Sequence, residues 1–435
     1  MLIFKTAFCS LFLLSLSSLG VAAIVDWQNP TPSALAPFDN NAKLVAEIAN
    51  NQIMLYSHPQ QNIKFQTIKG LKSYNNVQFT TGAFVVNATP QQIQNTLQNY
   101  ANYVGLFPTL KTAKILEEKQ NIKQVKYRIS VPTPIKVLNF KEDVIIQHEI
   151  HQNHLSSLFI DSPLQYGLSN IEWFALDGQK SLVTITHWSD TESVKGFLVS
   201  TILKAMPEAK VAMPYAVNTF VIESLRLKFN GKGTPQTLTT AVPEKNISST
   251  NYQKIIELSK KTAQPIAFVH SPVNVSYKHG QEEMRFTTSY QYFNASAHQT
   301  EKLLEPTVYQ QLFPKYVRKI ELIPNQDTSK DAIIYVRAGL GVITIPFNLR
   351  LRFLPPKNNT VDMFAVGGDM KLMKTTMQIS PYQQNSVWKM TSAAKIDASA
   401  PFLLRSMRSL PYHDVLPTAA VSKVIASKAR NELKF

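Results

Sequence analysis

The sequence of 435 residues contains a single cysteine, Cys9, which lies inside an apolar segment at the N-terminus. A chain that loses this segment has no disulfide, no thiol nucleophile and no cysteine ligand for a metal ion. An exported chain of this length that lacks disulfides has to be held together by core packing. Catalysis by a thiol is therefore excluded for the mature chain.

Sequence motifs of hydrolases and nucleotide-binding enzymes are also missing. No Gly-x-Ser-x-Gly elbow occurs, which removes the usual signature of a serine hydrolase. The pair Gly339-Leu340-Gly341 lacks the third glycine and the helix start of a dinucleotide-binding loop, so we interpret it as a kink or bulge in a strand. Asp362 and Asp369 stand in a pattern that predicts a hairpin with solvated turn residues rather than an acid–base pair.

The histidine-rich segment "QHEIHQNHL" comes one residue short of a zinc motif, because His148-Glu149 is followed by His151 instead of a histidine at 152. That motif requires a helix, whereas this segment reads as two strands around a Gln152-Asn153 turn. On a strand, His148 and His151 point to opposite faces. We therefore expect exposed histidines at the edge of a hairpin, and we predict no metal site, no cofactor and no assigned catalytic residue.

The first residues, "MLIFKTAFCSLFLLSLSSLGVAA", combine a lysine, an apolar run and small residues at Val21 and Ala23. This pattern predicts a secretory signal peptide, residues 1–23, cleaved after Ala23, and a periplasmic or secreted location. A retained membrane anchor fits less well, because the apolar run is short and ends in small residues. Loss of Lys5 takes the formal net charge from +16 to +15.

Such a positive charge attracts anionic partners, namely phospholipid headgroups, lipopolysaccharide phosphates or nucleic acid. Export argues against nucleic acid, so we expect no nucleic-acid partner and a working position near an anionic membrane surface. With 44% hydrophobic and 17% charged residues, the composition is that of an ordinary globular protein.

The most informative feature is an internal repeat. "QFTTGAFVVNAT" (78–89) corresponds to "RFTTSYQYFNAS" (285–296) at an offset of 207, and Leu106-Phe107-Pro108 corresponds to Leu312-Phe313-Pro314. "KILEE" from 114 matches "KIELI" from 319, "KLVAEIAN" from 43 matches "KIIELSKK" from 254, and both copies finish on Leu-Lys-Phe. The chain is a tandem duplication. We predict unit 1 at residues 24–230, a linker at 231–251 that is poor in apolar residues, and unit 2 at 252–435, each unit with an N-terminal helical extension.

Within each unit the hydrophobic pattern predicts a strand, two short helices, about six antiparallel strands and a long terminal helix. Thr89-Pro90 is typical of a helix start. An antiparallel sheet needs one face covered, and the terminal helix is the largest element available to cover it. The fold class is therefore α+β, with a curved antiparallel sheet wrapped around a C-terminal helix in each unit and space for an apolar ligand between them.

This order of elements, carried by "FTTGAFVVNATPQQIQNTLQNYANYVGLFP" and the following "KILEE", resembles the START-like helix-grip superfamily, which includes polyketide cyclases and the coenzyme Q-binding group. The resemblance covers roughly 150 residues of each unit. It implies a cavity for a lipid, sterol, isoprenoid or aromatic polyketide. In unit 2, Ala297 replaces the helix-starting proline and Gly339–Gly341 interrupts a strand, so whether the second cavity is open or collapsed is left undecided.

Strand alternation places Val125, Tyr127 and Ile129 on one face. We predict that the ligand cavities are lined by aromatic and apolar residues around one polar tip: Phe107, Val125, Tyr127, Ile129, Trp173, His187 and Tyr215 in unit 1, and Phe313, Tyr335, Phe364, Trp388 and Met390 in unit 2. The alternative is that the same residues form solid core.

Three functions remain open at this stage. The leading one is an exported protein that binds or transfers a hydrophobic molecule, such as a lipid, an isoprenoid or a quinone-like compound. The second is a cyclase or hydrolase that acts on a cavity-bound polyketide or lipid, with His187 or Glu172 moving a proton. The third is a non-catalytic protein-interaction module, which well-filled cavities would favour.

Overall fold

The computed structural model describes residues 23–131, 140–277, 280–340 and 343–435. The proposed signal peptide therefore lies, except for Ala23, outside the described residues. Among the described residues, no helix is both long enough and apolar enough to span a bilayer.

Unit 1 contains the order of elements that its sequence predicts. It comprises α1 (Ala42–Ala49), β1 (Ile53–Ser57), β2 (Gln61–Thr67), β3 (Gly70–Val77), β4 (Thr80–Val86), α2 (Pro90–Gln98), α3 (Tyr103–Leu106), β5 (Leu110–Lys119), β6 (Ile122–Val131), β7 (Phe140–Ile150), β8 (His154–Asp161), β9 (Gly167–Ala175), β10 (Ser181–Ser189), α4 (Phe197–Ala205) and α5 (Glu208–Asn230). The six antiparallel strands β5–β10 and the terminal helix α5 follow the two short helices, as expected.

Unit 2 repeats this order. After β11 (Gln236–Thr237) come α6 (Ser249–Thr262), β12 (Ile266–Val269), β13 (Val273–Tyr277), β14 (Gly280–Met284), β15 (Thr287–Phe293), α7 (Ala297–Thr300), α8 (Val308–Leu312), β16 (Val317–Pro324), β17 (Lys330–Leu340), β18 (Ile343–Phe353), β19 (Thr360–Gly368), β20 (Leu372–Tyr382), β21 (Asn385–Lys395), α9 (Phe402–Arg405) and α10 (Leu416–Leu433). The predicted α+β fold, in which each antiparallel sheet grips its own C-terminal helix, is confirmed.

The repeated "NAT" and "NAS" motifs have a structural reason. Thr89 and Ser296 are helix N-caps, and each forms a capping box with the glutamine three residues later. The alanine before each cap accepts a hydrogen bond from a serine at the start of the last strand, Ser181 in unit 1 and Ser386 in unit 2, at 2.8 Å in both. The repeat therefore preserves side-chain contacts as well as the hydrophobic pattern.

A second repeated contact runs across the outer face of each sheet, the face away from α5 and α10. His58 bonds to Thr81 and Thr81 bonds to Thr186, with distances of 2.7 and 2.8 Å. In unit 2 the same chain is His270–Thr288–Thr391, with 2.7 and 2.9 Å. Because His58 and His270 make the same contacts, they are equivalent positions of the two units. Residues of β1 and β12 that are 212 positions apart therefore correspond.

The two sheets are joined edge to edge, a feature that the sequence did not reveal. One antiparallel sheet of 16 strands runs in the order β16-β17-β18-β19-β20-β21-β15-β12-β1-β4-β10-β9-β8-β7-β6-β5. At its centre β1 pairs with β12, and Leu55 lies opposite Ala267, its own counterpart in the repeat. A pseudo-twofold axis therefore passes between β1 and β12.

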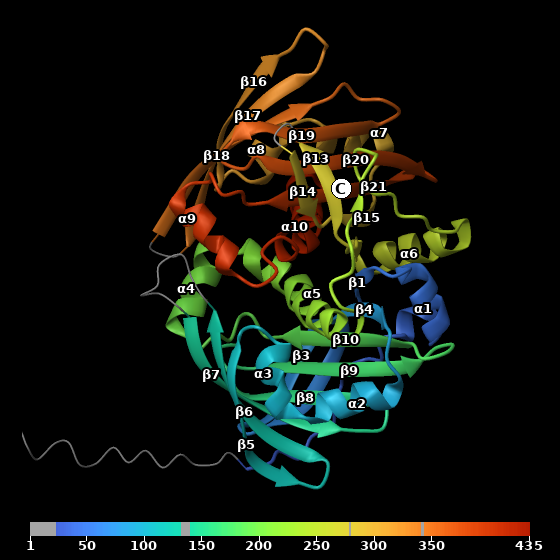
Figure 1. The fold of residues 1–435 in the computed structure, drawn as a ribbon, viewed down its shortest axis with the longest axis vertical. Helices are drawn as coiled ribbons and strands as arrows, with labels where there is room; N and C mark the ends of the chain where they lie inside the picture. The colour runs from blue at the N-terminus through green and yellow to red at the C-terminus, as the bar shows by residue number, and fades with distance from the viewer. Residues whose placement is uncertain (1–22, 132–139, 278–279, 341–342) are drawn as a thin grey trace, which may run out of the picture.

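The joined sheet curls around α5 and α10, which lie against each other in the middle of the molecule (Figure 1). Helix α5 approaches β4 closely at Gly82, where an added Cβ would lie 3.1 Å from the Cβ of Asn218. Because α5 contacts its own sheet on one side and α10 on another, buried residues occur all around it instead of along one stripe.

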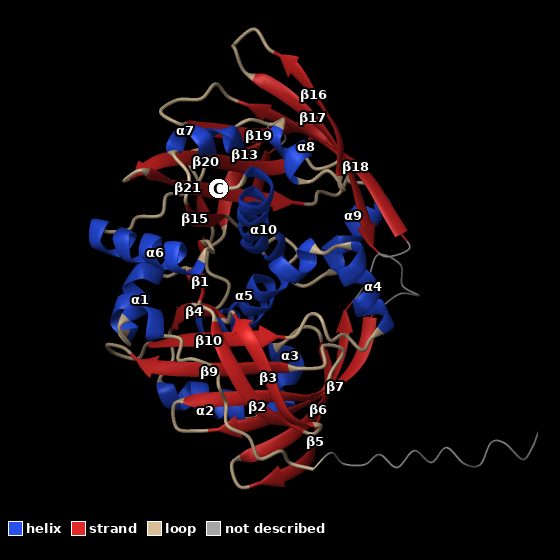
Figure 2. Ribbon diagram, turned by 180° about the vertical axis from the view of Figure 1, so that it is seen from behind, coloured by secondary structure: helices blue, strands red, loops and turns tan. Residues whose placement is uncertain are grey.

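The outer face of the sheet carries a second layer. The hairpin β2–β3 covers unit 1 (Figure 2), and the shorter hairpin β13–β14 covers part of unit 2. Helices α1 and α6 pack over the central strands. Residues 23–35, here called the N-terminal arm, cross the outer face of unit 1. The segment predicted as a linker, 231–251, also packs: the Lys245 ammonium donates to the carbonyls of Ile48 and Ala49 at the end of α1.

A buried ion-pair cluster also connects the two units. The Glu223 carboxylate on α5 accepts from Arg226 on the same helix and from Arg285, which precedes β15, with N–O distances of 2.7 Å in both cases. All three side chains are less than a tenth exposed. Burial raises the pKa of Glu223, but the hydrogen bonds and charges of the two guanidinium groups outweigh it and hold the pKa below its usual value.

Candidate functional site

Unit 1 contains a cavity of about 230 Å³ between the inner face of its sheet and α5. Strands β6 to β10 supply one wall, α5 supplies another through Val217, Phe220 and Val221, and the segment around α3 closes one end. The lining is almost entirely aromatic and aliphatic, with a few polar side chains. This is the position in which the sequence predicts a ligand cavity.

The aromatic walls of the cavity are held by ring contacts. Tyr103 stacks on Tyr127 with the ring centres 6.0 Å apart and the planes 9° from parallel, and its hydroxyl donates to the carbonyl of Leu97 at 2.7 Å. Phe107, from the repeated Leu-Phe-Pro motif, stacks on Phe220 of α5 at 6.3 Å. The motif therefore places one aromatic ring of the cavity wall against the gripping helix.

The polar part of the wall is a hydrogen-bonded chain centred on His148. Its Nε2 lies 2.9 Å from the Tyr127 hydroxyl, and its Nδ1 lies 2.8 Å from the Ser157 hydroxyl. The imidazole stacks on Tyr100 at 4.8 Å. Burial lowers the pKa of His148 to about 3, so the imidazole is neutral near pH 7, with one ring nitrogen donating and the other accepting.

His187 is the second histidine of the cavity. Burial, together with the positive charge of Lys423 on α10, lowers the pKa of His187 to about 4. Its Nδ1 is buried without a hydrogen-bond partner. His187 therefore adds a second neutral imidazole to the wall of an otherwise largely apolar cavity.

The structure brings together four of the seven residues predicted for unit 1. Phe107, Tyr127, Ile129 and His187 line the cavity. Val125, Trp173 and Tyr215 are buried in the core and are not among the lining residues. Tyr215 instead joins the units, since its hydroxyl donates to the carbonyl of Pro265.

Three of the five residues predicted to line a cavity in unit 2 lie on the inner face. Trp388 and Met390 are buried in the cluster that packs against α10, and Phe313 lies against the same cluster. This cluster, which includes Leu351, Met363 and Met377, fills the position that corresponds to the cavity of unit 1. The alternative interpretation of these residues, solid core, fits unit 2.

The predictions for Tyr335 and Phe364 were wrong. Tyr335 is 38% exposed on the outer face and its hydroxyl donates to Glu321, while its neighbours Ile334 and Val336 pack against the inner cluster. Phe364 pairs with Arg352 and also lies on the outer face. The sequence pattern predicted both residues on the inner face of their strands. Successive side chains of a strand point to opposite faces, so an error of one residue places a side chain on the wrong face.

Two further expectations need correction. Glu172, suggested as a proton mover, lies on the outer face, where its carboxylate accepts from the backbone N–H of Ala34 at 2.7 Å. His148 was expected to be exposed and is instead 5% exposed in the cavity wall. His151 and His154 do lie at the hairpin, with their rings stacked at 4.2 Å. Within the described ranges, no group of metal-ligating side chains could hold an ion.

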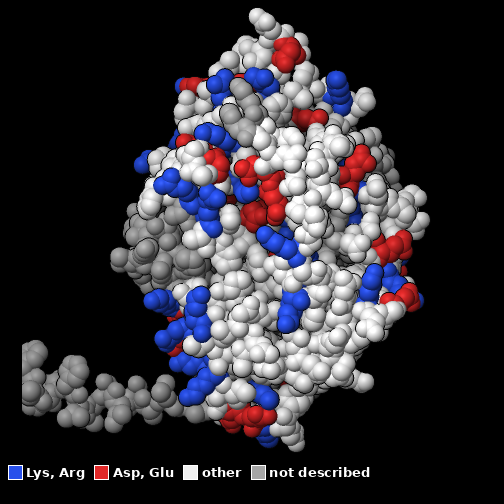
Figure 3. Space-filling model, viewed as in Figure 1, with Lys and Arg blue, Asp and Glu red and all other residues white. Residues whose placement is uncertain are grey.

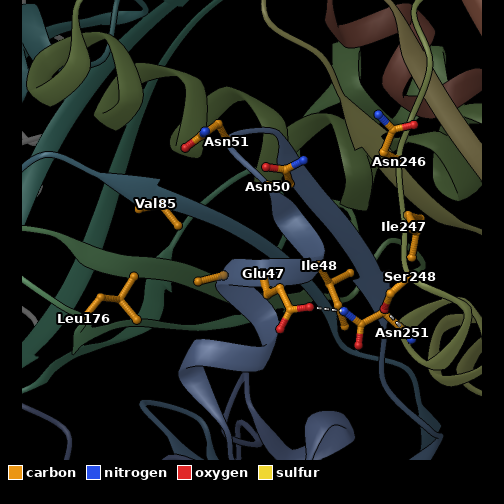
Figure 4. Close-up of a pocket in the computed structure, with 11 residues that line it drawn as sticks. Glu47, Ile48, Asn50, Asn51, Val85, Leu176, Asn246, Ile247, Ser248 and Asn251 are labelled. Atoms are coloured by element: carbon orange, nitrogen blue, oxygen red, sulfur yellow. Dashed lines mark hydrogen bonds between the residues drawn. The ribbon is translucent and has the colours of Figure 1, made fainter.

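A second hollow, of about 420 Å³, lies between α1, the end of the linker and the start of α6 (Figure 4). Its lining includes Asn50, Asn51 and Asn246, and Glu47 accepts a hydrogen bond from Asn251 at 2.8 Å. Such a mostly polar surface lacks the apolar walls that the predicted ligand class requires. The cavity of unit 1 is therefore the candidate site.

No family model matches the sequence. No curated protein matches it either. The solved structures that it is similar to include BexL, a di-domain aromatase/cyclase from the BE-7585A biosynthetic pathway, with 10% identity, 82% of this chain and 99% of that chain covered, and a TM-score of 0.27.

Two single-domain structures align with part of the chain. The Zhui aromatase/cyclase from Streptomyces sp. R1128 has 18% identity, covers 36% of this chain and 98% of its own, and gives a TM-score of 0.28. A STAR-related lipid transfer protein from Xanthomonas axonopodis has 15% identity, 38% and 94% coverage and a TM-score of 0.26. These proteins are of the types that the sequence resembles. The two-unit helix-grip assignment rests on the element order and strand pairing described above.

Proposed function

We propose that the protein binds a small, uncharged, mostly apolar molecule in the cavity of unit 1. The observation that carries this proposal is the cavity itself, walled by Tyr103, Phe107, Tyr127 and aliphatic side chains and closed by α5. Burial of apolar ligand surface at about 25 cal/mol per Å² supplies the driving force.

The size of the cavity narrows the ligand class. Its 230 Å³ compares with roughly 150 Å³ for an apolar protein cavity that binds benzene. A one- or two-ring aromatic compound or a short isoprenoid fits this space, whereas a phospholipid or a long-tailed quinone does not fit inside it. The ligand class that the sequence suggests is thus narrowed from lipids in general to compounds of one or two rings or short isoprenoids.

The charge state of the cavity points the same way. His148 and His187 are neutral near pH 7, because burial lowers their pKa values to about 3 and about 4. The lining contains no carboxylate, lysine or arginine among the described residues. A neutral ligand fits such a lining without leaving a charge buried.

The place of action is also a proposal. Exposed basic side chains gather over β5–β7, along the left border of the molecule in Figure 3, and they include Lys111, Lys114, Arg128 and Lys141. We propose that the exported protein uses this basic surface to approach anionic headgroups. Each lysine or arginine near such a membrane surface contributes about 1 kcal/mol to the attraction. Export itself still rests on the signal pattern of residues 1–23.

The binding test uses 2-naphthol, a neutral two-ring probe with one hydroxyl. Val217→Trp places an indole in the cavity and is expected to weaken naphthol binding at least about tenfold, measured by calorimetry. Val421→Trp, at the corresponding position of α10 where the core is filled, is the matched control and should bind naphthol like wild type.

Circular dichroism should show that both variants are folded, and Ser169→Leu offers a milder way to fill the same cavity. Equal binding by Val217→Trp, Ser169→Leu and wild type would contradict the proposal. So would the absence of any apolar compound from organic extracts of natively purified protein, combined with no affinity for naphthol.

A second candidate function follows from the chain Ser157–His148–Tyr127, which reaches the cavity from three neighbouring strands. Such a chain can move a proton to or from a bound ligand, as acid–base catalysis requires. Under this candidate, 1-naphthyl acetate would be hydrolysed by wild type, and Ser157→Ala would lower kcat at least about tenfold while naphthol affinity stayed unchanged. No turnover above the uncatalysed rate would leave binding as the sole function of the cavity.

A further inference from the structure

A partly apolar groove of about 830 Å³ lies on the outer face of unit 2. It lies between the hairpin β13–β14 and strands β18–β20. Its apolar lining comes from Tyr277, Phe364, Val366 and Leu372. This outer groove is separate from the sheet–helix space and has no role in the function proposed above.

The duplication shows what covers the same position in unit 1. Strands β8 and β19 contain the same β-bulge. In unit 1, Ile145 and Ile146 of β7 pair with Asp161 and Phe159 of β8. In unit 2, Arg350 and Leu351 of β18 pair with Gly367 and Ala365 of β19. The bulged residues, Ile160 and Val366, therefore correspond. Ile160 is 4% exposed, whereas Val366 is 37% exposed.

The cover over Ile160 consists of the hairpin β2–β3 and an extended peptide, the N-terminal arm. Val25 and Trp27 are buried in one cluster with Ile160 and Leu158, while Asp26 between them is exposed. The backbone N–H of Val25 donates to the Gln147 side chain at 2.8 Å and its carbonyl accepts from the same side chain at 2.7 Å. Alternate side chains and backbone hydrogen bonds both hold the arm, as in other extended-peptide sites.

In unit 2 the linker supplies only part of such a cover. Leu238 and Val242 pack against the cluster that contains Leu372, but Val366 is still 37% exposed. The linker leaves the end of α5 at Gly231, whose carbonyl accepts from Arg226, and then pairs through Gln236–Thr237 with the edge of β13. Residues 231–234 are exposed. The hairpin is also shorter, with five residues in each strand against seven and eight in unit 1. The described residues therefore leave the part of this face around Val366 uncovered in unit 2.

We propose that the outer groove binds an extended segment of a partner polypeptide, with two apolar side chains two residues apart and a negative charge. The spacing is that of Val25 and Trp27 in the arm. The charge follows from the lining, which contains Arg352, Lys371 and Lys374 and one acid, Glu282. Because Arg352 pairs with Asp331 and Glu282 pairs with Lys395, the positive charge offered to a ligand comes from the two lysines. At the corresponding positions of β7 and β9, unit 1 has the neutral residues Gln147 and Leu168.

The test uses the full-length mature chain and a labelled peptide with the sequence of residues 24–31, IVDWQNPT, added in trans. Fluorescence anisotropy is expected to show saturable binding. Trp27→Ala in the peptide should weaken it about tenfold, because the largest buried side chain is lost, and Asp26→Lys should weaken it a few-fold through the cationic lining.

Val366→Lys in the protein should weaken peptide binding at least about tenfold, because it puts an ammonium group where an apolar side chain would pack. Ile115→Lys is the matched control, since Ile115 is a similarly exposed strand residue on β5 of the other unit, 44% against 37% for Val366. It should bind the peptide like wild type. Both substituted positions face solvent, so both variants are expected to fold, which circular dichroism checks.

Three outcomes would overturn the proposal. One is no saturable binding of the wild-type peptide. Another is unchanged affinity in Val366→Lys, which would place the peptide in the unit 1 seat by exchange with the arm. The third is binding of phosphatidylglycerol vesicles that depends on Val366 and is not competed by the peptide, which would make the groove a membrane contact.

Discussion

Lowering the pH from 6.5 to 4.5 is expected to unfold the protein. Burial is the main cause of lowered pKa values in four histidines: about 4 for His58 and His187 and about 3 for His148 and His270. All four are at most 5% exposed. In the unfolded chain each has its ordinary pKa of about 6.5.

The direction of the effect follows from proton uptake. Because each folded pKa is lower than the unfolded one, the unfolded chain binds more protons below pH 6.5. The stability is complete above that pH and is lost as the pH falls toward 4. Four such groups together give a slope on the order of 5 kcal/mol per pH unit, and total stabilities of domains are about 5–15 kcal/mol, so two pH units are enough.

Urea unfolding followed by circular dichroism at pH 7, 6 and 5 measures this slope. Replacing His58 and His270 by glutamine should roughly halve it, because two of the four groups are removed. His298→Gln is the control, since the side chain of His298 is almost fully exposed. A free energy of unfolding that stays constant between pH 7 and 5 would show that these histidines are protonated in the folded chain.

Glu223→Gln is expected to lower the free energy of unfolding by about 3–5 kcal/mol at pH 7. The substitution removes the one carboxylate that Arg226 and Arg285 share, and it leaves two guanidinium groups buried without a counter-charge. Since Arg226 also holds Gly231 at the start of the linker, the contact between α5 and unit 2 should weaken as well. Chemical denaturation of the two proteins gives the difference directly.

Asp143→Asn is the matched control for this prediction. Asp143 also bonds two cations, Lys126 and Arg128, but at a site where Arg128 is 57% exposed. Solvent screens such a pair, so the loss should stay below about 1 kcal/mol. Similar losses in Glu223→Gln and Asp143→Asn would mean that the buried cluster contributes no more than a surface ion pair.

The order of elements could be predicted because it depends on local sequence signals, helix caps and strand alternation. The repeat contains these signals twice. The hydroxyl residues Thr89 and Ser296 start helices for a reason that lies within four residues of chain. The alternation Val125–Tyr127–Ile129 likewise fixes a face without knowledge of the partner strand. Local capping and period-two patterning therefore carried the fold class.

The errors concern information that is not local. Tyr335 and Phe364 stand in strands where the two units share no sequence match, and their neighbours Ile334 and Met363 pack in the inner cluster instead. His148 shares a face with Val144 and Ile146 by the same alternation, so the sequence does indicate that it points inward. The segment was instead compared with a zinc motif and interpreted as an exposed hairpin edge. The pairing of β1 with β12 consists of backbone hydrogen bonds, which leave no trace in side-chain pattern.

The pairing of Leu55 with Ala267, its own counterpart, has a consequence for the history of the chain. An edge that pairs with a copy of itself about a twofold axis is the interface of a symmetric homodimer. The tandem chain thus has the geometry of two fused subunits, in which a single ancestral unit would have dimerised through the same edge. Once fused, the two copies no longer had to be identical. Unit 1 could keep a cavity between sheet and helix, while unit 2 packed its inner face with core side chains and left a groove on its outer face.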